Sequence, residues 1–188
     1  MKLLRLRKQK NESNRLVKEY IITALIELMK EHDYHSITIT DITRKAGVSR
    51  MAYYRNYTSK EDIFKKYIDE VGEQIHKQIA GHHSASVPYD YFLALFEHLS
   101  TYSDLAIVAY RAHLGELILA ALIKNMFITF PPPNDSAAER YHRFFMAGAF
   151  YNVFIEWLKS GLQETPAEMA RFCAEMATSG CPSPFDEV

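Results

Sequence analysis

The chain has 188 residues, of which 48% are hydrophobic and 24% charged, the composition of a soluble globular protein. No apolar run reaches the roughly 18 residues that cross a bilayer, which excludes a membrane protein. Residues 1–66 hold 15 of the 22 Lys and Arg but only 8 of the 23 Asp and Glu. The N-terminal third is therefore basic and the rest acidic, which predicts that the N-terminal part binds a polyanion.

The N-terminus and the cysteines indicate the cellular compartment. No apolar segment and cleavage site follow the basic start, so a secretory signal is not expected. The two cysteines, Cys173 and Cys181, are too few for a secreted disulfide scaffold and are interpreted as free thiols. These features predict a cytoplasmic protein.

Helix periodicity begins early in the chain. Apolar residues recur at i, i+3 and i+4 and predict an amphipathic helix over residues 14–31. Thr38 with Asp41 three residues later predicts the N-cap of a second helix. Gly47 is expected to end that helix in a left-handed conformation, and Ser49 to cap a third. Two short helices joined by so tight a turn form a helix-turn-helix over about residues 38–57.

The rest of the chain reads as further helices. Ser59 is expected to cap a fourth helix that runs to about residue 80, with loops at 81–88 and around the prolines at 131–133. Later helices are expected over about residues 89–101, 104–113, 115–129, 136–160 and from 166 onward. The predicted fold is all-α, with about nine helices, a DNA-binding domain at 1–66 and a helical regulatory and dimerisation domain at 67–188.

The third helix carries two adjacent tyrosines. At about 100° per residue, Val48, Tyr53 and Tyr57 can face a three-helix core. Tyr54 then lies on the opposite side. One tyrosine is therefore predicted to be core and the other surface.

Three stretches, TITDI at 38–42, AGVS at 46–49 and YRNYTSKEDI at 54–63, resemble the DNA-binding domain of the TetR family of bacterial transcriptional regulators. The resemblance covers about residues 14–71. It implies that Thr38, Lys60 and Tyr54 contact DNA phosphates, the first two at helix N-termini where the dipole favours an anion. Arg5, Arg7, Lys8 and Lys10 form a basic arm, which is expected to be disordered in the free protein and to reach along phosphates or into the minor groove.

Base reading is expected from the outward side of the third helix. Arg50 suits guanine and Met51 a thymine methyl, with Ser49 and Arg55 beside them. Asn56 either binds a phosphate or caps the end of its own helix. Relatives often carry a small residue at the place of Met51 and His or Tyr at that of Asn56, so the operator sequence cannot be transferred from them.

The C-terminal part is predicted to pair two subunits. Residues 144–158 are apolar nearly all round, and the last helix presents a second apolar seam. A four-helix bundle formed with a second copy would bury both, as the resemblance also implies. The expected interface residues are Phe144, Gly148, Tyr151, Met169, Phe172, Cys173 and Met176. A homodimer would place two recognition helices on successive major grooves of a palindromic operator in double-stranded DNA.

Aromatic side chains between these helices suit an apolar or aromatic effector, although each stripe alone is also ordinary core. The candidate ligand-binding residues are Phe92, Phe96, Tyr110, His113, Phe127, Asn152 and Glu156. The resemblance implies a repressor that an effector releases from DNA. Residues 147–161 also resemble the regulators of dihydroxyacetone-kinase operons, which raises the alternative of a coactivator whose C-terminal domain binds a partner protein.

Several kinds of chemistry are not expected. The histidines lack the spacing of a zinc site, so no metal is predicted. No nucleophile motif, glycine-rich phosphate loop or spaced pair of acids appears, so the chain is predicted to need no cofactor and not to be an enzyme.

Overall fold

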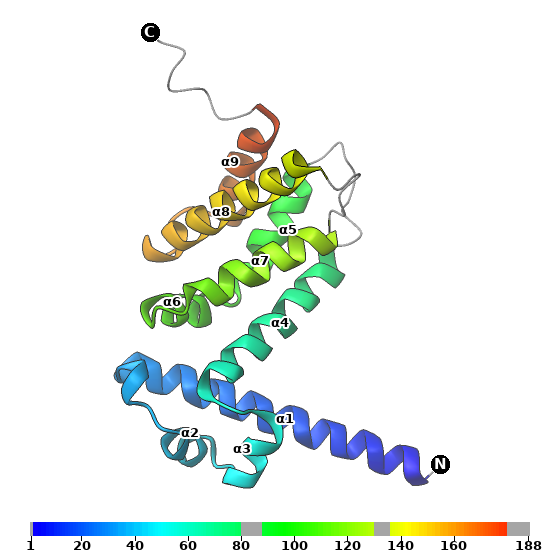
Figure 1. Cartoon of the computed structure of the whole chain (residues 1–188), viewed down its shortest axis with the longest axis vertical. Helices are drawn as coiled ribbons and strands as arrows, with labels where there is room; N and C mark the ends of the chain where they lie inside the picture. The colour runs from blue at the N-terminus through cyan, green and yellow to red at the C-terminus, as the bar shows by residue number, and fades with distance from the viewer. Residues whose placement is uncertain (1, 80–87, 130–135, 180–188) are drawn as a thin grey trace. The chain divides into compact units, whose positions relative to one another are not determined.

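The computed structural model describes residues 2–79, 88–129 and 136–179. These residues form nine α-helices and one 3-10 turn and contain no strand, which confirms the all-α prediction (Figure 1). None of the helices within them is long and apolar enough to span a lipid bilayer. The chain divides into two compact units, Met1–Ile68 and Asp69–Val188. The proposed domain boundary at residues 66 and 67 stays a prediction, because helix α4 runs through it without interruption.

The first helix, α1 (Lys2–Glu31), is longer than the sequence predicts. The expected start at residue 14 is wrong, and the basic segment before it is helical rather than disordered. No glycine or proline interrupts residues 2–31, so nothing local ends the helix. Arg15 adds ion pairs one turn away on either side, to Glu12 and to Glu19, which support helix in the stretch that follows the basic segment.

The two short helices α2 (Ile39–Ala46) and α3 (Arg50–Asn56) begin and end where the sequence predicts. Thr38 and Asp41 form a reciprocal capping box at the start of α2. Gly47 ends α2 with φ of 65°, a conformation that costs glycine little. The Ser49 hydroxyl accepts a hydrogen bond from the backbone N–H of Ala52 at 3.1 Å and so caps α3.

A turn that the sequence pattern does not predict precedes α2. Residues Tyr34–Ser36 form the 3-10 turn η1, which Asp33 caps by accepting the N–H of His35 at 2.8 Å. Helix α4 (Lys60–Ile79) follows α3, and the Ser59 hydroxyl accepts the N–H of Asp62 at its start. The predicted cap at Ser59 is thus confirmed.

The core of the first unit joins α1, α2, α3 and α4. Its side chains are fully or almost fully buried. The largest of them are Tyr53, Phe64, Ile21, Leu25, Ile42 and Ile63. The predicted inward position of Tyr53 is confirmed, since its exposure is 0%, and Tyr57 is also buried, at 3%.

The second unit contains the remaining helices α5 (Pro88–Ser100), α6 (Ser103–Arg111), α7 (Gly115–Thr129), α8 (Ala137–Lys159) and α9 (Pro166–Ser179). Their bounds lie within about two residues of the predicted ones. The predicted loops at 81–88 and 131–133 lie almost wholly outside the described residues. In Figure 1 α7 and α8 run side by side, and α5 packs against α9.

The ends of α8 and α9 follow local sequence signals. Ser136 caps α8, and Gly161 lies just beyond its end with φ of 81°. Thr165 and Glu168 form a second capping box, at the start of α9. The turn between the two helices is closed by the indole N–H of Trp157, which donates to the carbonyl of Glu164 at 2.9 Å.

A substitution series at Tyr53 tests its place in the core. Its hydroxyl is buried without a hydrogen-bond partner among the described residues, and burial raises its pKa to about 12. We expect Tyr53→Phe to leave the free energy of unfolding unchanged or slightly higher, because it removes an unsatisfied polar group. Tyr53→Ala should lower that free energy by about 3–5 kcal/mol through the cavity it leaves. Urea denaturation followed by circular dichroism measures both.

The matched control is Tyr54→Ala, whose side chain is 55% exposed. It should change the free energy of unfolding by no more than about 0.5 kcal/mol. A loss of several kcal/mol in Tyr53→Phe would show that the hydroxyl has a stabilising partner and would contradict this assignment.

Candidate functional site

The turn between α2 and α3 has the geometry of a helix-turn-helix. Gly47 donates its N–H to the carbonyl of Arg44 at 3.2 Å, and Val48 donates to that of Thr43 at 3.0 Å. These bonds close the end of α2, and Ser49 starts α3 almost at once. Two helices joined in this way cross steeply, which leaves one side of the second helix free for a DNA groove.

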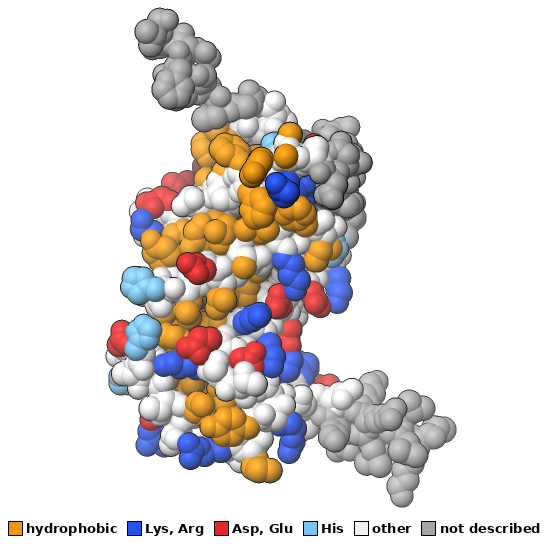
Figure 2. Space-filling view, in the orientation of Figure 1, with side chains coloured by type: hydrophobic (Ala, Val, Ile, Leu, Met, Phe, Trp, Pro, Cys, Tyr) orange, Lys and Arg blue, Asp and Glu red, His pale blue; other side chains and the backbone are white. Residues whose placement is uncertain are grey.

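The exposed side of α3 carries the residues predicted to read bases. Arg50, Met51, Tyr54 and Arg55 are all exposed, Met51 at 76%. Tyr53 and Tyr54 point to different sides of the helix, although their rings meet edge to face with centroids 5.3 Å apart. Figure 2 shows Lys and Arg side chains around the part of the first unit that holds α2 and α3, with hydrophobic side chains between them.

Thr38 and Ser49 have their hydroxyls engaged in caps. The Thr38 hydroxyl donates to the carboxylate of Asp41 at 2.6 Å and accepts the N–H of the same residue. This donation, together with the N–H of Thr38, lowers the pKa of Asp41 below its usual value. Thr38 and Ser49 are exposed at the N-termini of α2 and α3, where a phosphate would meet unpaired N–H groups and the positive end of the helix dipole.

Lys60 is bound to its own protein. Its ammonium donates to the carbonyls of Tyr34, His35 and Ile37 at 2.5, 3.2 and 3.0 Å, and it lies 4.4 Å from the centre of the Tyr34 ring. An ammonium has three hydrogens, so these carbonyls account for all of them. This geometry does not support the predicted contact between the Lys60 side chain and a phosphate. It fastens η1 to the start of α4 instead.

Of the two roles predicted for Asn56, its side chain adopts the cap at the end of its own helix. Its side-chain amide donates to the carbonyl of Ala52 one turn earlier, at 2.9 Å. The carbonyl of Asn56 in turn accepts the ammonium of Lys66 at 2.8 Å. The end of α3 is thereby closed by Asn56 and α4 together.

Some of the aromatic residues predicted to bind an effector lie close together. Phe92 stacks on Phe150 with centroids 6.2 Å apart, and Phe96 lies between Phe150 and Trp157 at 5.4 and 5.2 Å. Phe127 meets Phe144 edge to face at 6.0 Å. Phe150 belongs to this cluster although the sequence prediction leaves it out; its spacing of three residues from Ala147 and four from Phe154, which puts all three on one side of a helix, was the available signal.

The polar residues predicted for the effector do not converge on these rings. His113, Asn152 and Glu156 are exposed, and Tyr110 is 36% exposed. The Asn152 amide donates to the carbonyl of Gly148, and Glu156 accepts the ammonium of Lys159 at 2.6 Å. The correction has a simple cause: a polar stripe on a long helix faces the solvent when the opposite side is the core.

The residues predicted for the subunit interface also separate into two groups. Phe144 is 47% exposed, Phe172 47% and Met176 38%. A Cβ added at Gly148 would meet no atom within 4 Å, so that position is open. These four offer surface to a second copy.

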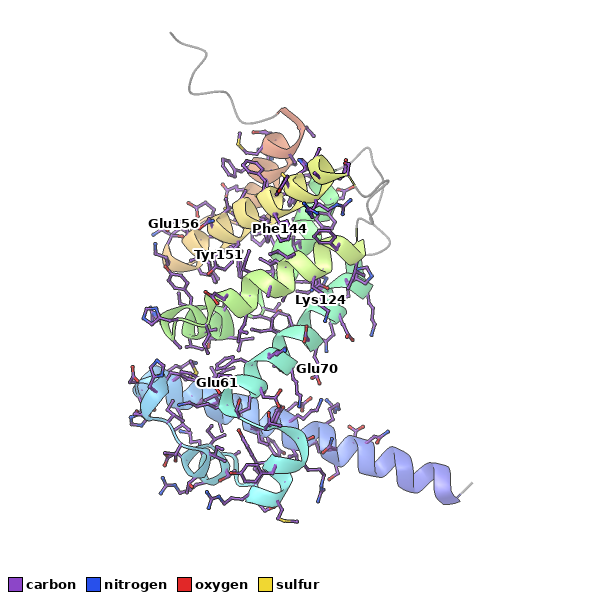
Figure 3. The ribbon with its side chains drawn as sticks, viewed as in Figure 1. Glu61, Glu70, Lys124, Phe144, Tyr151 and Glu156 are labelled. Atoms are coloured by element: carbon purple, nitrogen blue, oxygen red, sulfur yellow. The ribbon has the colours of Figure 1, made fainter. Side chains whose placement is uncertain are left out.

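The other three predicted interface residues pack against their own chain. Met169 and Cys173 are buried at 9% and 7% exposure on the side of α9 that packs on α5, and burial raises the pKa of the Cys173 thiol to about 11. The Tyr151 hydroxyl lies 2.3 Å from where a Cβ on Gly115 of α7 would be. Figure 3 shows Phe144 and Tyr151 along α8 beside α7. Met169 and Cys173 therefore pack within their own chain, and half-buried Tyr151 does so in part, because the periodicity of a helix does not say which of two faces meets its own chain.

An exposed apolar stripe on α8 is absent from the predicted interface residues. Tyr141 is 65% and Phe145 69% exposed, and Ala149 is exposed one turn further on. These residues lie four apart and so share one face of the helix. Figure 2 shows hydrophobic side chains gathered on the second unit where α8 lies. The sequence contained this signal, but the nearly continuous apolar character of the helix hid it.

Comparisons with known proteins agree with this geometry. Residues 21–67 match the family model described as bacterial regulatory proteins, tetR family, and residues 86–179 match a model described as transcriptional regulator C-terminal region. A helix-turn-helix followed by a helical second unit is an architecture found in DNA-binding transcription regulators. The chain belongs to the TetR family of bacterial transcriptional regulators.

Individual relatives give the same class. The HTH-type transcriptional regulator YxbF of Bacillus subtilis (strain 168) is 36% identical over 64 residues, which cover 32% of this chain and 17% of that protein. The HTH-type transcriptional regulator AlkX of Mycobacterium tuberculosis (strain ATCC 25618 / H37Rv) is 26% identical over 86 residues, which cover 45% and 41%. The chain thus spans less than half the length of these two relatives.

A solved structure extends the likeness to the whole fold. The crystal structure of a TetR-family transcriptional regulator from Syntrophomonas wolfei str. Goettingen covers 91% of this chain, and the chain covers 99% of it. The TM-score is 0.66 at 16% sequence identity. At this identity the match shows the shared fold.

Replacing Lys60 tests whether it stabilises the protein or binds DNA. Lys60→Met should lower the free energy of unfolding by about 2 kcal/mol, because three carbonyls lose a charged donor. The dependence of DNA affinity on salt should keep its slope, since no phosphate contact is removed. Urea denaturation and binding titrations at several salt concentrations measure the two effects.

The control is Lys65→Met, an exposed lysine on the same helix. It should leave the free energy of unfolding within about 0.5 kcal/mol of the parent. If Lys60→Met retained full stability but reduced the salt slope by about one, the side chain would be a phosphate contact after all.

Proposed function

We propose that the chain is a homodimeric repressor that binds a palindromic operator through α3 and leaves it when a small apolar effector binds the second unit. The observation that carries the DNA part is the exposed side of α3, where two arginines, a methionine and a tyrosine stand on a helix whose other side is core. Cations, a hydrogen-bonding ring and a flexible apolar side chain suit phosphates and base edges.

The contacts divide by their chemistry. Arg50 and Arg55 are proposed to read base edges, with Met51 against a thymine methyl. Tyr54 is proposed to donate its hydroxyl to a phosphate. Such phosphate contacts place the helix in the groove but do not distinguish sequences.

A symmetric dimer is proposed to form through α8 and α9. Tyr141, Phe145, Phe172 and Met176 are large apolar side chains exposed on these two helices. Burying them against a second copy removes apolar surface from water, about 25 cal/mol for each Å². The two-fold symmetry of such a pair matches that of a palindrome and brings two recognition helices onto one face of the duplex.

Helix α4 is proposed to carry the effector signal, because its residues belong to both units. Within the second unit, its Asp69 accepts the ammonium of Lys124 on α7 at 2.7 Å. A Cβ at Gly72 of α4 would lie 2.3 Å from the side-chain amide of Asn125, so the Asn125 side chain of α7 packs directly on the α4 backbone at Gly72. An effector that shifts α7 would therefore displace α4, and it needs a preference of a few kcal/mol for the form that does not bind DNA.

DNA binding is tested with fragments from upstream of the chain's own gene and with random duplex of equal length. Arg50→Ala should weaken binding to the specific fragment by at least tenfold and reduce its advantage over random duplex. Tyr54→Phe should weaken binding to both DNAs by a similar factor of about 3 to 10, because it removes one phosphate hydrogen bond. The control Arg111→Ala, on the second unit, should leave both affinities unchanged. Equal affinity of the parent protein for both DNAs would rule out sequence-specific regulation.

The dimer is tested by placing charge on the apolar stripe. Phe145→Glu should raise the dimer dissociation constant more than 100-fold, because two carboxylates would be buried in the interface. Sedimentation equilibrium measures the constant, and operator affinity should fall with it. Ile128→Glu is the control, since that side chain is 50% exposed and belongs to α7 rather than to α8 or α9. A Phe145→Glu protein that stays dimeric would assign the interface to another surface.

A further inference from the structure

One charged side chain of the second unit is buried without adequate partners. Arg143 on α8 is only 7% exposed. Among the residues that the structure describes, Arg143 and Thr43 are the polar or charged ones that are buried. Its Nε and Nη1 atoms have no hydrogen-bond partner among the described residues. These two atoms carry three of the five N–H hydrogens of a guanidinium. Neither the proposed DNA surface nor the proposed dimer stripe uses this residue.

The surroundings of Arg143 satisfy only part of its charge. The closest carboxylate oxygen, on Glu139, is 3.8 Å from Nη2, which is too far for a hydrogen bond, and the Glu139 side chain is 36% exposed. The guanidinium carbon lies 5.4 Å from the centre of the Phe127 ring. A ring face attracts a cation but accepts no strong hydrogen bond. Three strong donors therefore remain without an acceptor.

Its place on α8 is otherwise that of a core residue. Arg143 shares one side of the helix with Ala147, Phe150 and Phe154, at intervals of four, seven and eleven residues. Ala147 and Phe154 are buried, and Phe150 packs against Phe92 and Phe96 of α5. An apolar residue at position 143 would continue this stripe without any desolvation penalty. A buried cation with unsatisfied donors is costly, so its presence points to an acceptor that the protein itself does not supply.

We infer that Arg143 binds the oxyanion head group, a carboxylate or a phosphate, of an effector whose apolar body contacts the aromatic side chains of α5, α7 and α8. This inference rests on the proposed effector response and specifies its chemistry. An oxyanion supplies several acceptor atoms and the opposite charge, and a guanidinium hydrogen-bonds both kinds strongly. Phe127, which already faces the guanidinium, and the stacked pair of Phe92 and Phe150 provide apolar surface for the remainder of the molecule.

The probes are octanoate, octyl phosphate and octan-1-ol, which share a chain and differ in the head group. Isothermal titration of the full chain without DNA should show at least one of the two anions binding tenfold or more tightly than the alcohol. Which anion binds more tightly identifies the head group. Equal affinity for all three probes, or no binding of either anion, overturns the inference.

Variants locate the head group. Arg143→Met should reduce the preference for the anion to less than twofold, and Arg143→Lys should retain part of it. Arg140→Met, an exposed arginine three residues earlier on α8, is the matched control and should bind all three probes as the parent does. An Arg143→Met protein that keeps the full preference for the anion overturns the inference.

Thermal unfolding separates a ligand-binding role from a structural one. Without ligand, Arg143→Met should melt at the same temperature as the parent or higher, because an apolar side chain of similar volume replaces an unsatisfied buried cation. A lower melting temperature or failure to fold would show that Arg143 holds the structure together and would overturn the inference. These titrations and melting curves contain no DNA. If they overturn the anion site, the proposed operator binding is unaffected. If operator binding fails, the evidence for the anion site is unaffected.

Discussion

The structure of the first unit depends on the burial of α3 against the rest of its core. Helices of eight and seven residues are too short to persist in water on their own propensity. They exist here because Ile42 and Tyr53 are removed completely from solvent against α1 and α4. The capping box at Thr38 and the cap at Ser49 satisfy N–H groups at the two helix starts, and the ammonium of Lys60 ties down the turn before α2. The exposed side of α3 is available to DNA only because its other side is held in this way.

The second unit is organised around a helix with two apolar sides. One side of α8 packs within the chain through Phe154, Ile155 and Trp157. The other leaves the aromatic side chains of Tyr141 and Phe145 in solvent, an apolar surface that a second copy could cover. Arg143 interrupts the inner side with a guanidinium whose Nε and Nη1 atoms have no hydrogen-bond partner among the described residues. The same helix thus combines a core side, a surface suited to a second copy and a group suited to an anion. A movement of α8 would therefore change all three.

Prediction from the sequence was accurate where local chemistry decides the outcome. Caps at Thr38, Ser49 and Ser59 and the left-handed Gly47 set helix ends through bonds within a few residues, so their positions could be predicted directly. The split between Tyr53 and Tyr54 followed from helix geometry. The start of α1 was missed, since its basic residues suggested a disordered arm although nothing in that stretch breaks a helix.

Local signals determined the helices, their order and the side of α3 that faces out, because these depend on spacing and caps that each segment carries with it. Tertiary structure alone decided which of several apolar faces on α8 and α9 meets the chain itself, and so packed Tyr151, Met169 and Cys173 against their own chain and left Tyr141 and Phe145 outside. It also brought the Lys60 ammonium to three carbonyls more than twenty residues away and buried Arg143 with its Nε and Nη1 atoms unbonded among the described residues. The physical reason is that burial and hydrogen-bond partnership are set by distant segments that come together only in the folded chain.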